Sequence, residues 1–126
     1  MQATAKYFLA LGSINAMLAV ILGAFGAHGL KGRLAPDLLA VYQTGVQYHF
    51  YHALGLLAAG LLIIQLPASA LLRWCGWLMF CGIVLFSGSL YLLALMHAPV
   101  FGMITPLGGI AFIISWLLMF AAILKS

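Results

Sequence analysis

Residues 7–26 read YFLALGSINAMLAVILGAFG, a run without a single charged side chain. A helix needs about 20 consecutive apolar residues to cross the ~30 Å hydrocarbon core of a bilayer, and this run has that length. Three further apolar runs occupy residues 43–66, 71–96 and 105–124, with Arg73 as their only charge. The sequence therefore predicts an all-α fold, an integral membrane four-helix bundle formed by a single transmembrane domain over residues 1–126.

The composition excludes a water-soluble domain and most kinds of catalysis. Hydrophobic residues make up 67% of the chain and charged residues 5%, whereas soluble proteins carry roughly 25% charged residues. Asp37 is the sole acidic residue, so neither paired carboxylates nor a serine–histidine–acid set can form inside the bundle. The five Lys and Arg residues form no basic stripe, which argues against nucleic acid. We therefore expect a protein that is not an enzyme and is surrounded by membrane lipids.

Proline, serine and glycine predict where the helices begin and end. Pro36 suits the first position of a helix, so the second helix is expected to start near residue 36, outside the hydrocarbon. Ser69 suits the N-cap of the third helix, and Thr105 suits the N-cap of the fourth, with Pro106 at its first position. The glycine-rich segment 26–33 is expected to be a loop. Short connections make sequence neighbours antiparallel, which gives an up-down-up-down bundle.

Small residues mark the expected packing faces, because helices in lipid associate where their backbones can approach closely. In the first helix Gly12, Ala16, Ala19, Gly23 and Ala27 fall on one stripe at spacings of three and four. We expect this stripe to face a neighbouring helix.

Basic residues predict the orientation. Lys6, Arg73 and Lys125 flank the runs on the side of the termini, against Lys31 and Arg33 on the other side. Since Lys and Arg are more frequent in cytoplasmic segments, we expect a multi-pass protein whose N- and C-termini are both cytoplasmic. The first run is longer than the apolar part of a cleavable signal peptide, so we expect it to be retained.

Four motifs, spread over almost the whole chain, indicate a relationship. They are LGAFGAH at residues 22–28, YQTG-x-x-Y-x-x-x-H at 42–52, LFSGSLY at 85–91 and TP-x-GG at 105–109. In this order they resemble the DUF423 (YgdD/YwdK-like) family of small bacterial inner-membrane proteins, which has a small eukaryotic transmembrane relative. The resemblance implies a four-helix protein of the bacterial inner (plasma) membrane and supplies no biochemical activity.

Polar side chains are predicted to gather in the half of the membrane on the Lys31 and Arg33 side. Counting 1.5 Å per residue from Gln43, His52 lies about 13 Å deep, and ionisable residues at such depth are functional candidates. The candidates for a ligand-binding polar pocket in this extracytoplasmic half are His28, Tyr48, His52, Ser87, Ser89, Tyr91 and Thr105. The opposite half is expected to be mostly apolar apart from Asn15, Ser115 and the tryptophans at the membrane surface. The alternative is that the polar side chains only tie the helices together through hydrogen bonds.

These observations leave several functions open. We expect a non-enzymatic accessory or assembly protein, or a binder of a lipid-like small molecule in the extracytoplasmic half. A small transporter or proton pathway is one alternative, and an apolar half beyond His52 would argue against it. A metal or haem redox protein is another, but only His49 and His52 are weak metal candidates, so we expect no metal and no cofactor.

Two further expectations concern partners and the two histidines. Either a second copy of the chain or a different membrane protein could be the partner. Because His49 does not lie on a motif, we expect His52→Ala to disturb the protein more than His49→Ala.

Overall fold

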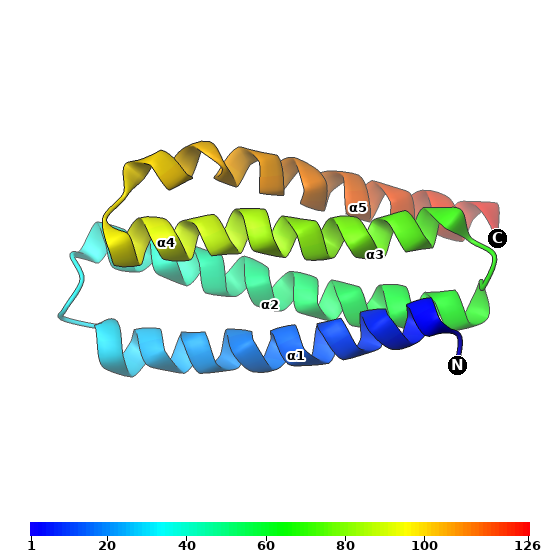
Figure 1. Cartoon of the computed structure of the whole chain (residues 1–126), viewed down its shortest axis with the longest axis horizontal. Helices are drawn as coiled ribbons and strands as arrows, with labels where there is room; N and C mark the ends of the chain where they lie inside the picture. Colours follow the sequence, from blue (N-terminus) through cyan, green and yellow to red (C-terminus); the bar gives the residue numbers. More distant parts are fainter.

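Four long helical segments and no strand make up the computed structural model, which describes every residue from Met1 to Ser126 (Figure 1). The first segment is α1 (Ala3–Phe25) continued by the π-helical turn η1 (Gly26–Leu30), and the second is α2 (Pro36–Gln65). The third consists of α3 (Ala70–Gly82), the π-helical turn η2 (Ile83–Ser87) and α4 (Gly88–Met96). The fourth is the 3-10 helix η3 (Pro99–Met103) followed by α5 (Thr105–Lys125). Each segment is long and apolar enough to cross a membrane, which confirms the predicted all-α, four-helix fold.

The segments lie side by side and alternate in direction, with both termini at the same end of the bundle (Figure 1). This arrangement agrees with the predicted up-down-up-down topology. α1 packs mainly against α2, and α5 packs mainly against α3. α2 also packs against α3 and α4, so it is the central helix, with α1 and α5 on opposite sides of the bundle (Figure 1).

The predicted helix starts at Pro36, Ser69 and Thr105 agree with the structure to within one residue, but the predicted capping role of Thr105 is wrong. α2 begins at Pro36, and the Ser69 hydroxyl caps α3 by accepting the Leu72 N–H at 3.3 Å. Thr105 is not an N-cap: α5 already includes it, and the residue before it, Ile104, makes no side-chain cap. The Thr105 hydroxyl instead lies 2.5 Å from the Ser89 hydroxyl, so it joins two helices rather than ending one.

The predicted loop at residues 26–33 is also wrong over its first five residues. Gly26–Leu30 continue the first helix as a π-helical turn, and the connection to α2 is correspondingly short. Gly26 is buried against Tyr42, since a Cβ at residue 26 would lie 2.6 Å from that ring. A residue without a side chain is therefore needed at position 26 for the helix to pass this close to α2.

Glycines allow the helices to cross closely. A Cβ at Gly76 would lie 2.1 Å from the Phe8 ring, and a Cβ at Gly108 would lie 2.3 Å from the backbone nitrogen of Phe86. The predicted stripe on α1 is partly correct. Gly12 and Ala19 are buried, but Ala27 is exposed.

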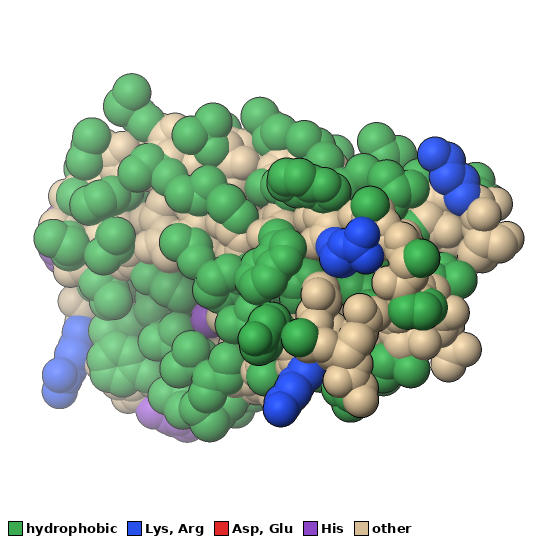
Figure 2. All heavy atoms as spheres, turned by 45° about the vertical axis from the view of Figure 1, so that its right-hand side comes forward, with side chains coloured by type: hydrophobic (Ala, Val, Ile, Leu, Met, Phe, Trp, Pro, Cys, Tyr) green, Lys and Arg blue, Asp and Glu red, His purple; other side chains and the backbone are tan.

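The half of the bundle toward the termini holds an apolar core. Its buried members come from four segments: Ala5, Phe8, Leu56, Ala59, Ile63, Leu72, Cys75, Met79, Ile83, Phe112, Met119 and Ala122. The outer surface is also largely apolar, and hydrophobic side chains cover most of the face seen in Figure 2. A chain that is apolar both inside and outside is adapted to lipid.

Candidate functional site

The structure divides the seven predicted pocket residues among separate contacts. His28 is exposed at the end of the first helical segment and makes no side-chain hydrogen bond, so the structure does not bring it together with the others. Tyr48 is also exposed, with its ring against Phe86 at a centroid distance of 4.8 Å. The remaining five take part in the hydrogen bonds between helices described below.

Asn15, His49 and Tyr91, which we call the polar network, connect three helices. His49 Nε2 lies 2.9 Å from Asn15 Oδ1 on α1, and His49 Nδ1 lies 2.8 Å from the Tyr91 hydroxyl on α4. The Asn15 amide nitrogen donates to Leu11 O at 2.8 Å. His49 is buried, with 4% of its surface exposed, and is the centre of the network.

The hydrogen bonds of the polar network fix the direction of each donor. Because the Asn15 amide nitrogen donates to Leu11 O, its oxygen faces His49 and accepts from Nε2–H. His49 Nδ1 is then the acceptor for the Tyr91 hydroxyl. Both ring nitrogens of His49 are therefore used within the chain.

His52 is held in a second, independent arrangement that faces α5. Its Nδ1 lies 2.7 Å from Tyr48 O, which can only accept, and the Trp116 indole N–H donates to Nε2 at 3.0 Å. The imidazole also stacks on the Phe112 ring, with a centroid distance of 3.4 Å and an interplanar angle of 8°. Both ring nitrogens of His52 are again occupied, and the neutral imidazole with its proton on Nδ1 satisfies both contacts.

Two serines join helices through their hydroxyl groups. The buried Ser87 hydroxyl donates to Gly45 O at 2.7 Å, which connects η2 to α2. Ser89 donates to Phe86 O at 2.9 Å and pairs with Thr105 on α5. Every buried side-chain nitrogen and oxygen in the protein has a hydrogen-bond partner.

The two weak metal candidates, His49 and His52, do not face a common site. Although His49 and His52 are three residues apart, His49 binds side chains of α1 and α4, whereas His52 binds a side chain of α5. No three His, Cys, Asp or Glu side chains lie close enough together to hold a metal ion. A metal at either histidine would first have to break one of its hydrogen bonds.

The polar network lies nearer mid-bundle than the sequence predicted. Asn15 is near the middle of the segment Ala3–Leu30, and His49 is near the middle of Pro36–Gln65. Asn15, assigned by sequence to the opposite half, therefore belongs with His49. The expectation that the half toward the termini is apolar agrees with the core described above.

Sequence reasoning missed Trp116, placed Asn15 in the opposite half and named His49 only as a weak metal candidate. Asn15 follows the buried Gly12 by three residues and precedes the buried Ala19 by four. That spacing on the packing face was the available signal that it points toward a neighbouring helix. Trp116 was not singled out, and its indole contact depends on how α5 packs.

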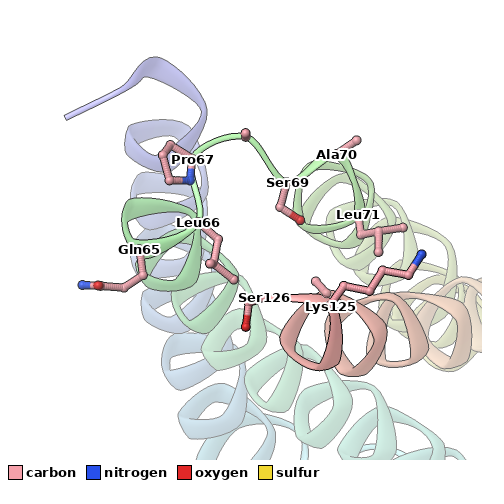
Figure 3. Close-up of a pocket in the computed structure, with 10 residues that line it drawn as sticks. Gln65, Leu66, Pro67, Ser69, Ala70, Leu71, Lys125 and Ser126 are labelled. Carbon is pink, nitrogen blue, oxygen red and sulfur yellow. The ribbon is translucent and has the colours of Figure 1, made fainter.

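Of three hollows in the surface, only one is lined by a residue of the polar network, Tyr91. One lies at the end that carries both termini, between the α2–α3 connection and the end of α5, where Gln65, Pro67, Ser69 and Lys125 line it (Figure 3). Another is a shallow apolar groove beside α4 that Ser89 and Tyr91 line together with Leu92, Phe101 and Ile104. A third is a shallow hollow between α1 and α2.

One face of α2 is polar and exposed, and we call it the α2 outer face: Gln43, Gln47, Tyr48 and Tyr51. Within α2, side-chain hydrogen bonds are made only by Tyr42, Thr44, His49 and His52. The four side chains of the α2 outer face therefore make none. The rings of Tyr48 and Tyr51 contact each other edge to face at 5.8 Å. The α2 outer face thus contrasts with the interior, where every polar atom is paired.

The sequence is similar to known proteins along nearly its whole length. The profile of a family described as "Protein of unknown function (DUF423)" matches residues 22–109. UPF0382 membrane protein YwdK of Bacillus subtilis is 56% identical over 120 residues, which cover 95% of this chain and 98% of that protein. UPF0382 membrane protein SERP0230 of Staphylococcus epidermidis is 51% identical over 120 residues, covering 95% of this chain and 97% of that protein. No solved structure matches the chain. The resemblance that the four motifs indicated is confirmed.

Proposed function

The chain belongs to the DUF423 family, whose relatives are named membrane proteins, and from this premise we propose that it is a non-enzymatic accessory or assembly protein. In this proposal it acts by lateral helix contacts within the bilayer, in the bacterial inner membrane with both termini in the cytoplasm. The observation that carries the proposal is the contrast between a fully paired interior and an unpaired polar α2 outer face.

The interior supports a structural rather than a chemical role. Catalysis or ligand coordination needs groups with free hydrogen-bonding or coordinating capacity, and the ring nitrogens of His49 and His52 have none to spare. In membranes, polar side chains that bond between helices stabilise helix packing. The polar network fits this role because it joins α1, α2 and α4.

Transport is disfavoured by the apolar core. A proton or ion pathway must cross the whole bilayer through polar groups or water. Between His52 and the end that carries the termini, the buried side chains of α2 are Ala53, Leu56, Ala59 and Ile63. The Ser115 hydroxyl, also buried, bonds to its own helix at Phe112 O. A polar path therefore stops at mid-bundle.

Binding of a lipid-like molecule is a second candidate, favoured by the groove beside α4. Two predicted pocket residues, Ser89 and Tyr91, line this groove, and its other walls are mostly apolar. An acyl or prenyl chain would suit such a groove, because its walls offer apolar contact and few polar groups.

Native mass spectrometry of the protein extracted from its own membrane in polymer nanodiscs separates these two functions. An accessory protein is expected to retain a protein partner in fixed ratio, whether a second copy or another chain. The double variant Gln43→Leu/Gln47→Leu is expected to lose that partner, and Ile113→Leu on the exposed face of α5 is the matched control. A single wild-type chain carrying one small apolar molecule would contradict the proposal and support lipid binding.

A further inference from the structure

We infer that the partner on the α2 outer face is a second copy of the same chain, paired so that Gln47 of each copy bonds to Gln47 of the other. This inference rests on the proposed function, since it identifies the occupant of the same face. Four steps support it: the depth of Gln47, the contrast with the other helices, the symmetry imposed by the membrane, and the space beside Gln47.

The depth of Gln47 makes an unpaired amide unfavourable. If the hydrocarbon begins near Gln43, as the sequence predicts, Gln47 lies four residues deeper, or about 6 Å. A polar group exposed to lipid cannot bond to water, so it favours any arrangement that supplies a partner. Tyr51 lies one further turn inside on the same face, and its hydroxyl is unpaired as well.

The other helices show no comparable feature. The exposed side chains in the middle of α5 are hydrophobic, such as Ile113 and Leu117, with 70% and 60% of their surfaces exposed. On α1 the exposed Ser13 hydroxyl donates to Leu9 O at 2.8 Å and needs no partner. Exposed side-chain amides away from the helix ends therefore occur only on α2. They distinguish the α2 outer face from the apolar surfaces that face lipid.

The membrane restricts how two copies can meet. Copies inserted in the same orientation are related by an axis along the membrane normal, so each residue on the axis meets its own counterpart at equal depth. A charged residue would meet a like charge, but a glutamine amide is both donor and acceptor and can pair with itself. The α2 outer face contains two glutamines, two tyrosines and no charge, so it is self-complementary.

The surface beside Gln47 allows a close approach. Gln47 and Tyr51 border the shallow hollow between α1 and α2, whose other lining residues include Ala19, Gly23 and Ala24. Small residues permit helices to approach closely in lipid. The hollow therefore offers room for a side chain of the partner copy next to the unpaired amides.

Cysteine cross-linking in intact membranes tests the inference. In a background with Cys75→Ala and Cys81→Ala, the single changes Gln43→Cys, Gln47→Cys and Tyr51→Cys are oxidised with copper phenanthroline. We expect a disulfide-linked species of twice the 13.5 kDa chain mass, strongest at residue 47. Ile113→Cys, exposed on α5, is the matched control and is expected to remain monomeric.

Two differently tagged copies, expressed together, identify the partner and do not depend on the cysteine-free background. Recovery of both tags in one complex, with native cysteines present, is expected. An adduct to a different protein at residue 47 would overturn the inference while the proposed function stands. No adduct at 43, 47 or 51, together with no association of the tagged copies, would overturn both.

Energy transfer between labelled copies in liposomes measures the strength of pairing. Gln43→Leu/Gln47→Leu is expected to weaken self-association about tenfold, equivalent to ~1.4 kcal/mol, because inter-helix hydrogen bonds are lost while leucine is well solvated by lipid. Ile113→Leu is expected to leave it unchanged. Equal self-association of the double variant and the wild type would refute the role of the glutamines.

Discussion

Replacing His49 by alanine should be among the most destabilising single changes in this protein. The substitution removes two inter-helix hydrogen bonds, to Asn15 and Tyr91, and leaves the buried Asn15 and the half-buried Tyr91 without this partner. Such bonds contribute about 0.6–1.7 kcal/mol each in membrane proteins. The missing ring adds a cavity, and large-to-small changes in cores cost at least ~2 kcal/mol, so we expect a total loss of about 3–5 kcal/mol.

A double-mutant cycle isolates the hydrogen bond from the cavity. Asn15→Ala, His49→Ala and the double variant are unfolded reversibly by SDS in mixed micelles, with tryptophan fluorescence as the signal. A coupling free energy of about 1 kcal/mol is expected between the two residues. Ser13→Ala is the control, since the exposed Ser13 hydroxyl bonds only to its own helix. The reasoning is refuted if the coupling is zero and His49→Ala costs no more than Ser13→Ala.

Three other changes test the packing of the helices. Gly76→Ala should destabilise the protein by about 2 kcal/mol in the same assay, because the new Cβ would overlap the buried Phe8 ring; no loss would mean that the ring can move aside. Trp116→Phe should release His52 Nε2 from its donor and shift its imidazole ¹⁵N resonance, and an unchanged spectrum would argue against that hydrogen bond. His28→Ala should leave stability within about 0.5 kcal/mol of the wild type, since His28 is exposed, and a larger loss would show an unrecognised contact.

The sequence predicted the number of helices and most of their ends because these depend on local chemistry. Hydropathy over about 20 residues identifies a span, and Pro36 and Ser69 mark helix starts through their own backbone and side-chain preferences. Thr105 was predicted incorrectly as a cap because a hydroxyl has the same local preference whether or not another helix is near. Its pairing with Ser89 depends on tertiary packing, which the local pattern does not contain.

The candidate site was harder to predict because it depends on which helix faces meet. Ser87, Ser89, Tyr91 and His52 do make hydrogen bonds between helices, as the hydrogen-bonding alternative expected. His49 was ranked below His52, yet the two histidines are equally buried, with 4% exposed, and only His49 joins three helices. Depth along a single helix gave no information on rotation about its axis, which determines the partners of each side chain.

The π-helical turn η2 changes the direction in which side chains point about the axis of the third segment, so that α3 and α4 present differently rotated faces. A π-helical turn accommodates one residue more than an α-helical turn, and each residue of an α-helix advances the side chains by about 100°. α4 is therefore rotated relative to an uninterrupted continuation of α3: α3 packs on both α2 and α5, whereas α4 packs mainly on α2. Loss of a single residue from Ile83–Ser87 would turn Ser89 and Tyr91 away from Thr105 and His49 without shortening the span appreciably. The number of residues in the third segment is consequently fixed by its side-chain contacts, although a helix one residue shorter would still cross the bilayer.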